Sequence, residues 1–440
     1  MITNPDWRGQ RYAVLGLARS GAATVRALLA SGAEVVAWDS KTQAREALVD
    51  EVQTLSHTLD TVMLSFADPL EIDLTGFAGI VVSPGVPLNR HPIAAKAQAA
   101  GVPIIGDIEL FAQARAHLPP HRVVGVTGTN GKSTTTALIH HIVVADGIPA
   151  RLGGNIGLPI LGEEPLPAGG IYVLELSSYQ IDLTQSLDCD VAVLLNITPD
   201  HLDRYDGFAG YAASKARLFA MQSAAHDAVI GIGDAASAAI ARSLSARGEH
   251  LHKIAPGVCM DQSRWPSLQG PHNAQNALAA IAACHALDIR EVAIDDGLET
   301  FRGLPHRMER VGTVDGVAYV NDSKATNPDS TAPALAAFDR IHWILGGQAK
   351  THDLDACRPS FGHVRAAYTI GEAGPMLRDL LSAEMPVADC GTLAEAVHAA
   401  RAAAVAGDTV LLSPACASFD QFRDYEDRGD TFRGLVEALA

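Results

Sequence analysis

The chain of 440 residues is long enough for about three domains of ordinary size, each able to bury its own hydrophobic core. Its 33 Lys and Arg residues against 50 Asp and Glu residues give a net charge of -17, which disfavours a large nucleic-acid-binding surface and requires local positive charge for an anionic substrate. The amino-terminal residues show no signal-peptide pattern, and no apolar run reaches the ~18 residues needed to cross a membrane. We therefore expect a soluble cytoplasmic protein without a membrane partner. The cysteines form no C-x-x-C pair and are expected to be reduced thiols: Cys189, Cys259, Cys284, Cys357, Cys390 and Cys416.

The first segment alternates predicted strands and helices. Residues Arg11–Leu15 form an apolar strand that leads into a G-x-A-x-x-G turn from Gly16 to Gly21 and then into an alanine-rich helix. A second strand, Ala33–Trp38, ends in Asp39, 23 positions after the first glycine of the turn. This pattern is close to the nucleotide-binding fingerprint, although a lone match fits equally a helix packed tightly on a strand.

Two further stretches complete this segment. An apolar strand, Gly79–Val82, ends in the loop Ser83-Pro84-Gly85, and ligands of open α/β sheets bind at such carboxyl edges. Residues 106–120 are predicted to form a connecting helix and a linker.

The second segment opens with a phosphate-binding loop. After a short apolar run, the sequence TGTNGKST places Gly128, Gly131, Lys132 and Ser133 at a strand-to-helix junction. Such glycines let backbone amides approach phosphates, the lysine reaches the terminal phosphates, and the serine hydroxyl is suited to magnesium. Val126 stands where the strict G-x-x-x-x-G-K-S pattern has its first glycine, but the remaining core predicts ATP binding rather than a plain tight turn.

Polar residues follow two more predicted strands of this segment. Strand Ile171–Leu176 carries Glu175 near its end, and an acid in this place after a phosphate loop binds magnesium directly or through water. Strand Asp190–Ile197 is of the fully buried type and is closed by a dense polar loop that includes His201. Because carboxylates flank this histidine, we interpret it as a ligand or metal residue rather than a structural one. Lys215 lies on a predicted helix with few other charges, where side-chain chemistry alone indicates a surface lysine.

The third segment begins near Gly303 and repeats the pattern of strands that end in polar loops. Strands Val317–Val320, Ile341–Leu345 and Thr409–Leu412 run into NDSKATN, GGQAK and SPACAS. This fits a doubly wound domain with one functional edge, whose cations are suited to a carboxylate or a phosphate.

Eight motifs along nearly the whole chain occur in the same order in the Mur ligases. They are TGTNGKST (127–134), GGNIG (153–157), ELSSYQ (175–180), NITPDHLDRY (196–205), HNAQN (272–276), GLPHRME (303–309), NDSKATN (321–327) and SPACASFDQF (413–422). The chain resembles this family, and the last two motifs look most like its D-glutamate-adding member.

The resemblance implies a three-domain α/β fold. A Rossmann-like domain at 1–106 would bind the UDP substrate, a P-loop ATPase-like domain with a mostly parallel sheet at 107–302 would bind ATP, and a doubly wound Rossmann-like domain at 303–440 would bind the amino acid. It also implies that the third domain closes on the second to complete the ATP site, with a hinge near Gly303.

The resemblance implies an ATP-dependent amide ligase of peptidoglycan precursor synthesis. ATP would phosphorylate the terminal carboxylate of UDP-N-acetylmuramoyl-L-alanine, and the amine of D-glutamate would displace phosphate from the acyl phosphate. Two Mg²⁺ ions and fixed cations would supply the countercharge. A site assembled from one chain demands no protein partner, so we expect a monomer.

Site residues follow from the same resemblance. The ATP-binding set is Gly128, Thr129, Asn130, Gly131, Lys132, Ser133, Thr134, Asn273, Asn276, Arg307, Asp322 and Lys324. The metal set is Ser133, Glu175, His201 and Lys215, the last as a carbamate formed with carbon dioxide. The UDP-substrate set is Leu17, Ala18, Arg19, Asp39, Ser40, Ser83, Asn155 and His201. The D-glutamate set is Thr326, Lys350, Ser418, Phe419 and Tyr425, and the catalytic set is Lys132, Glu175, His201, Lys215 and Lys350.

Other functions stay open at this point. A sister ligase that adds another amino acid, or glutamate to a folate, would share the phosphate loop and the lysine-bearing helix, although the chain lacks the D-N-P-R segment of the diaminopimelate- or lysine-adding member. A nicotinamide-dependent oxidoreductase built on the first segment would leave TGTNGKST, HNAQN and NDSKATN without a role. A nucleotide-binding regulator would not need a third domain lined with cations.

Overall fold

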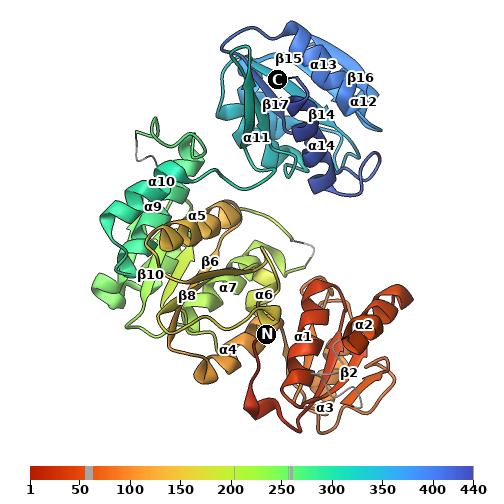
Figure 1. Ribbon diagram of the computed structural model, residues 1–440, viewed down its shortest axis with the longest axis vertical. Helices are drawn as coiled ribbons and strands as arrows, with labels where there is room; N and C mark the ends of the chain where they lie inside the picture. Colours follow the sequence, from red (N-terminus) through yellow and green to blue (C-terminus); the bar gives the residue numbers. More distant parts are fainter. Residues whose placement is uncertain (55–62, 203, 256, 258–260, 440) are drawn as a thin grey trace. The chain divides into compact units, whose positions relative to one another are not determined.

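The computed structural model describes residues 1–54, 63–202, 204–255, 257 and 261–439. The chain divides into two compact units, Met1–Pro256 with Gln275–Gly297, and Gly257–Ala274 with Leu298–Ala440. The first unit contains two sheets and the second contains one, each covered by helices (Figure 1). The predicted α/β class with three sheets is confirmed.

The first sheet has five parallel strands in the order β3-β2-β1-β4-β5. Its strands are β1 (Arg11–Leu15), β2 (Glu34–Trp38), β3 (Leu64–Phe66), β4 (Gly79–Val82) and β5 (Ile104–Ile105), and its helices are α1 (Arg19–Ala30), α2 (Thr42–Thr54) and α3 (Ile93–Ala100). Strand β1 lies between β2 and β4, and Leu15 pairs with both Trp38 and Val82. The loops that follow these three strand ends are therefore neighbours, which is where doubly wound sheets bind ligands.

The second sheet has six parallel strands in the order β11-β10-β9-β6-β8-β7. Its strands are β6 (His121–Thr127), β7 (Ala150–Gly154), β8 (Gly170–Glu175), β9 (Val191–Leu194), β10 (Asp227–Gly231) and β11 (Leu251–Ile254). Strand β6 lies between β8 and β9, with Val126 paired to Glu175 and Thr127 paired to Leu194. This register places the phosphate loop between the acid of β8 and the polar loop that follows β9.

The helices of this second region are α4 (Asp107–Ala114), α5 (Lys132–Ala145), α6 (Ser178–Asp182), α7 (Gly207–Ala220), α8 (Ala235–Ser243), α9 (Pro271–Ala286) and α10 (Glu291–Thr300). In all three regions of the chain, 3-10 helices are found at Pro5–Trp7, Arg115–His117, Ile160–Gly162, Ser245–His250 and Asp355–His363.

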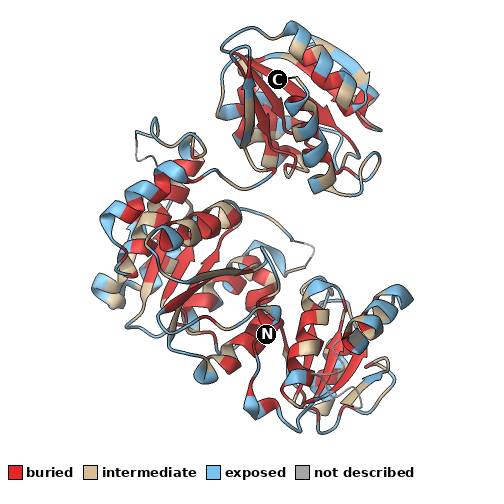
Figure 2. Cartoon of the chain, in the orientation of Figure 1, coloured by how far each residue is buried: buried red, intermediate tan, exposed pale blue. Residues whose placement is uncertain are grey.

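One hydrophobic core continues from the first sheet into the second. It includes Trp7, Leu28, Phe111, Tyr172 and Leu194. Helix α4 supplies part of this core, and Figure 2 shows it among the buried elements. The helix predicted within residues 106–120 is thus confirmed as α4 at 107–114. An apolar face with Ile108, Leu110 and Phe111 buries this helix between the two sheets instead of leaving it in solvent.

The third sheet is mixed, in the order β12-β13-β17-β14-β15-β16. Its strands are β12 (Glu309–Val314), β13 (Val317–Asn321), β14 (Ile341–Gly346), β15 (Val364–Ile370), β16 (Val387–Gly391) and β17 (Thr409–Leu412), and its helices are α11 (Pro328–Ala336), α12 (Gly374–Leu381), α13 (Leu393–Ala403) and α14 (Tyr425–Glu437). The ends of β13, β17 and β14 are neighbours, so the prediction that their polar loops share one edge of the sheet is confirmed. The antiparallel strand β12 was not predicted from the sequence. Its signal was the dipeptide Asp315-Gly316, which forms a tight hairpin turn with positive φ at both residues.

Two whole-chain expectations concern membranes and thiols. Within the described ranges, no helix is both long and apolar enough to cross a membrane. The thiols of Cys189, Cys284, Cys357, Cys390 and Cys416 are free, and all but Cys390 are buried. Cys259 lies outside the described residues.

The hairpin turn generates a stability prediction. Gly316 has φ +78°, and an added Cβ would lie 2.9 Å from the Cβ of Ala406. We expect Gly316→Ala to lower the free energy of unfolding by about 1–2 kcal/mol, because an L residue is strained in this conformation. Urea unfolding checks this, with Gly362→Ala as the control, since nothing lies within 4 Å of a Cβ there. Equal losses in both variants would contradict the strain argument.

Candidate active site

The phosphate loop lies between β6 and α5 and is built around two glycines with positive φ, Gly128 at 156° and Gly131 at 84°. A Cβ on Gly131 would clash with the side-chain oxygen of Asn276, so only glycine fits there. Gly131 caps helix α5, and among the described residues no side chain occupies the cap. The first amides of α5 are therefore positioned to bind an anion.

Two lysines converge on one carbonyl of this loop. Lys132 donates from Nζ to Gly128 O at 3.0 Å and to Thr129 O at 2.8 Å, while Lys215 donates from Nζ to the same Gly128 O at 2.8 Å. Lys215 is only 1% exposed and lies 4.7 Å from the ring centroid of Tyr211. Burial, together with the nearby Lys132 charge, lowers the pKa of Lys215 to about 7. The surface position that side-chain chemistry indicated for Lys215 is wrong.

Glu175 lies beside the phosphate loop, and only one of its two carboxylate oxygens has a hydrogen-bond partner among the described residues. Asn155 donates from Nδ2 to Glu175 Oε1 at 2.9 Å, so the structure brings together two predicted residues that the sequence assigned to different ligands. Glu175 Oε2 is buried, and within the described part of the chain it has no hydrogen-bond partner. A buried acceptor in this state costs free energy unless a cation or water meets it. The residue fits the predicted magnesium-ligand role.

The loop after β9 reaches the phosphate loop from the other side. Asn196 accepts from Asn130 N at 2.9 Å and donates to Asn130 O at 3.1 Å, and Thr129 Oγ1 lies 3.2 Å from the Tyr211 hydroxyl. His201 follows with a positive φ of 52°, and its ring lies 5.1 Å from the ring of Tyr179. Thr129 and Asn130 of the phosphate loop therefore hydrogen-bond to the loop that follows β9 and carries His201.

No three His, Cys, Asp or Glu side chains of the described residues converge closely enough to hold a metal by themselves. This is compatible with magnesium, which usually keeps several waters and binds one or two carboxylates with substrate phosphates. The fit therefore rests on Glu175 Oε2 and the phosphate loop, and we place His201 and Lys215 in the metal set only as predictions.

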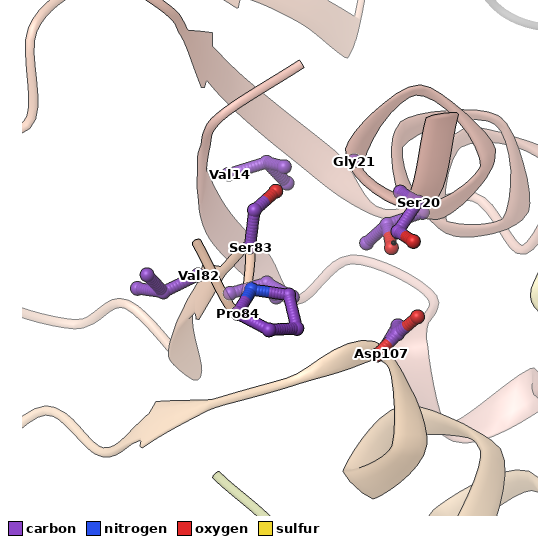
Figure 3. A pocket seen from close by; sticks show the side chains of 9 residues that line it. Val14, Ser20, Gly21, Val82, Ser83, Pro84 and Asp107 are labelled. Carbon is purple, nitrogen blue, oxygen red and sulfur yellow. Dashed lines mark hydrogen bonds between the residues drawn. The ribbon is translucent and has the colours of Figure 1, made fainter. Parts of the chain in front are cut away.

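Several of the residues predicted to bind UDP gather where β1 and β4 end. Ser83 Oγ donates to Gly16 O at 3.0 Å, and Leu17 N donates to Asp39 Oδ2 at 2.8 Å. A Cβ on Gly21 would clash with Gly16 O, which explains the second glycine of the G-x-A-x-x-G turn. Figure 3 shows Ser83, Ser20 and Gly21 around a small cavity at this turn.

Other members of the UDP set lie in the same region. Ala18 caps helix α1 and, like Ser40, is exposed. The exposed Arg19 donates from Nη2 to Gly157 O at 2.6 Å, so its charge touches the GGNIG loop.

Asp107 also lines this cavity and was not predicted from the sequence. Its side chain lies at the cavity together with that of Ser20 (Figure 3), and the residue is 5% exposed. Burial raises the pKa of Asp107 to about 6, while hydrogen bonds from the Ile108 amide and the Ser20 side chain oppose the rise. The only signal in the sequence was an acid at the first position of a helix, which is too common to identify a site.

Asn273 and Asn276 lie in the first two turns of α9, as predicted, and both are buried. The closeness of Asn276 to Gly131 brings α9 to the phosphate loop within the first unit.

The second unit gathers the remaining predicted residues around the carboxyl edge of its sheet. Lys350 Nζ lies 3.3 Å from Thr326 Oγ1, and Lys324 Nζ lies 3.6 Å from the ring centroid of Tyr425. Ser418 is buried, whereas Phe419 is 70% exposed and free to contact a ligand. The D-glutamate set thus comes from three loops that share one edge.

Asp322 is more deeply buried and more fully hydrogen-bonded than expected for a residue that contacts a nucleotide. Its carboxylate accepts from Ser413 Oγ at 2.7 Å and from Met308 N at 3.2 Å. Burial raises the pKa of Asp322 to about 7. The nearby charge of Arg307, which is also predicted to contact ATP, lowers the pKa of Asp322.

Arg428 holds the loops of this edge together and was also missed. Its guanidinium is fully buried and donates to Ser323 O at 2.8 Å and to Cys416 O at 3.2 Å. In the sequence DYEDRGD it has the appearance of a surface residue of a polar helix. Through these hydrogen bonds, Arg428 fixes the loops that carry Ser418 and Lys324.

Comparison with protein families gives one consistent result. A MurD-like N-terminal domain of Mur ligases matches residues 10–106, the Mur ligase middle domain matches 126–257, and the Mur ligase glutamate ligase domain matches 306–416.

Relatives match along the whole chain. The UDP-N-acetylmuramoylalanine--D-glutamate ligase of Novosphingobium aromaticivorans is 64% identical over 100% of this chain and 97% of its own length. The enzymes of the same name from Sphingopyxis alaskensis and Zymomonas mobilis are 59% and 56% identical, each over 100% of both chains.

Solved structures share the fold at low identity. UDP-N-acetylmuramate-alanine ligase MurC from Thermotoga maritima matches with a TM-score of 0.58 at 16% identity, over 98% of this chain and 100% of its own. UDP-N-acetylmuramoylalanyl-D-glutamyl-2,6-diaminopimelate--D-alanyl-D-alanyl ligase from Acinetobacter baumannii matches with a TM-score of 0.57 at 17% identity, over 84% and 92%.

The raised pKa of Asp107 predicts a pH-dependent stability. The pKa of Asp107 in the folded state, about 6, lies above its value in the unfolded state. The contribution of Asp107 to the free energy of unfolding is therefore fully present below about pH 4 and is lost as the pH rises through 6. Asp107→Asn cannot ionise, and we expect its stability relative to wild type to improve by about 1–2 kcal/mol between pH 5 and pH 8. Chemical unfolding at both pH values checks this, with the exposed Asp295→Asn as the control. A difference that does not change with pH would contradict it.

Proposed function

This chain belongs to the Mur ligase family, and on that premise we propose that it joins D-glutamate to UDP-N-acetylmuramoyl-L-alanine at the expense of ATP, in peptidoglycan precursor synthesis. Identity of 64% along the full chain to a ligase of that name supports the amino acid and the acceptor. The observation that carries the chemistry is the phosphate loop with Lys132 and Lys215 on one carbonyl. We further propose a cytoplasmic monomer.

The reaction needs ATP because a carboxylate is a poor electrophile. A terminal carboxylate oxygen of the acceptor attacks the γ-phosphorus of ATP, and the bond from that phosphorus to the ADP oxygen breaks. The amine of D-glutamate then attacks the carbonyl carbon of the acyl phosphate, loses a proton, and the C–O bond to phosphate breaks. The products are the amide, ADP and phosphate.

Residues of the first unit would bind the ATP phosphates. The backbone amides at the start of α5, which no side chain caps, would donate to the phosphates. Lys132 would replace its hydrogen bonds to loop carbonyls by contacts with the terminal phosphate. The remaining predicted ATP contacts are Gly128, Thr129, Asn130, Gly131, Ser133, Thr134, Asn273, Asn276, Arg307, Asp322 and Lys324. When bound beside Ser133 and Glu175, magnesium would neutralise charge on the phosphates.

Lys215 would act as a carbamate. Carbamylation needs a neutral amine, and burial beside Lys132 favours that form. The product is an anion next to Gly128 and Lys132, where it would replace a repulsion between two cations by an attraction. With His201, it would serve a second magnesium.

The two ends of the substrates would lie in different cradles. Leu17, Ala18, Arg19, Asp39, Ser40 and Ser83 would hold the UDP group, with Asn155 and His201 toward the muramoyl group. Thr326, Lys350, Ser418, Phe419 and Tyr425 would hold D-glutamate, with the Lys350 ammonium paired to a carboxylate.

The function predicts which amino acid releases phosphate from ATP in the presence of UDP-N-acetylmuramoyl-L-alanine. We expect release with D-glutamate and none with L-glutamate, L-alanine, L-lysine or diaminopimelate. Lys132→Ala is expected to abolish release. Release with another amino acid would assign a sister activity, and no release with any amino acid would leave a nucleotide-binding protein.

Removal of the Glu175 charge is predicted to impair turnover. Glu175→Gln keeps the amide contact with Asn155, and we expect kcat to fall about 10²–10³-fold because charge stabilisation is lost at the reacting phosphate. Steady-state kinetics check this against the exposed Glu249→Gln. Wild-type kcat in Glu175→Gln would remove Glu175 from the catalytic set.

The carbamate is tested by nuclear magnetic resonance with ¹³C-labelled bicarbonate. We expect a protein-bound carbamate signal in the wild-type protein that is absent in Lys215→Arg, because the arginine side chain stays protonated. Retained activity in Lys215→Arg without a carbamate signal in the wild type would show that Lys215 acts as a cation instead.

A further inference from the structure

Arg204 bridges two loops to which the proposed function gives different tasks. Its Nη2 donates to Val86 O at 2.9 Å and to Pro84 O at 3.4 Å, in the loop that follows Ser83. That loop belongs to the UDP cradle, since Ser83 Oγ donates to Gly16 O. Arg204 itself belongs to the loop of His201, whose backbone carbonyl accepts from Arg204 N at 2.9 Å.

The same guanidinium stacks on an aromatic cluster. Arg204 Cζ lies 4.3 Å from the centroid of the Tyr179 ring, and that ring lies 5.1 Å from the ring of His201. Tyr205 stacks on Tyr179 with an interplanar angle of 17°. Tyr179 is therefore in contact with both Arg204 and His201, and it lies in α6, the helix that follows the strand of Glu175.

His201 needs such support because of its backbone. A positive φ of 52° is unfavourable for a non-glycine residue and persists only where surrounding contacts enforce it. The local contacts are Asp200 Oδ1, which accepts from His201 N at 2.9 Å, and the Arg204 amide on His201 O. The ring of His201 is about half exposed, and its Nε2 lies 3.4 Å from Asp200 Oδ2. Of the two aromatic rings beside it, that of Tyr179 is the nearer at 5.1 Å, against 6.4 Å for that of Tyr211.

Arg204 also crosses a hollow between the two loops. Its walls include Pro84, Val86 and Leu88 on one side and Tyr179, Leu183 and Tyr205 on the other. The guanidinium therefore links two surfaces that are only partly packed against each other.

We propose that Arg204 is a positioning residue that couples the UDP-substrate loop at 83–86 to the His201 loop, acting through the Tyr179 ring. The inference rests on the proposed function, because it is that function which gives each loop a ligand. Loss of Arg204 would release both loops together and leave the phosphate loop intact.

Calorimetry of UDP-N-acetylmuramoyl-L-alanine binding, without ATP or magnesium, tests the coupling. We expect Arg204→Ala to raise the Kd about tenfold, from the loss of a stacked cation and its charge-assisted hydrogen bonds. Arg204→Lys is expected to recover little, because an ammonium cannot stack and fork as guanidinium does. Kd for ATP should stay at the wild-type value in both, and the exposed Arg242→Ala is the matched control.

Variants of Tyr179 separate coupling from general packing. Tyr179→Leu should weaken substrate binding as Arg204→Ala does, whereas Tyr179→Phe should stay close to wild type because the ring is kept. The double variant Arg204→Ala/Tyr179→Leu should bind no more weakly than either single variant, since both remove one connection.

Three results are decisive. Wild-type substrate affinity in Arg204→Ala, or additive losses in the double variant, would overturn the coupling. An equal rise in the Kd for ATP would show general damage and would also overturn it. A wild-type protein that fails to bind UDP-N-acetylmuramoyl-L-alanine would instead contradict the proposed function.

Discussion

Two ammonium groups that share one backbone carbonyl are the constraint on which the rest of this site depends. Lys132 and Lys215 both donate to Gly128 O, and Lys215 is fully buried. Two positive charges held on one carbonyl repel each other, and the Lys132 charge lowers the pKa of Lys215. The arrangement is relieved when Lys215 is neutral or when anions are present. In the proposed function, a triphosphate beside Lys132 and a carbamate on Lys215 would supply those anions, and the buried Glu175 would supply a third.

The sheets determine which groups surround this pair. Because β6 lies between β8 and β9, parallel pairing brings Glu175 and Asn196 to the two sides of the phosphate loop. In the first sheet, β1 between β2 and β4 brings Asp39 and Ser83 to the Gly16 turn in the same way. The chemistry of each region thus follows from strand order, and the core shared by the two sheets holds both regions in one compact unit.

Much of this arrangement was predictable because apolar strands that end in polar loops are visible in the sequence. The runs at 11–15, 79–82 and 409–412 gave strands with the observed bounds. Groups whose role depends on long-range burial were not predictable. Lys215 reads as a surface lysine until the fold buries it, and the resemblance alone indicated its importance. Asp107, Arg428 and the stack of Arg204 on Tyr179 likewise depend on which elements the fold brings together.

The most direct test of the account follows the oxygen atoms of the acceptor. UDP-N-acetylmuramoyl-L-alanine with both oxygens of its terminal carboxylate labelled with ¹⁸O is incubated with the enzyme, ATP and D-glutamate, and the released phosphate is analysed by mass spectrometry. If the phosphate loop and its lysines direct ATP to that carboxylate, one labelled oxygen appears in each phosphate and the other stays in the amide. Unlabelled phosphate released together with the amide would contradict activation of the carboxylate by phosphorylation.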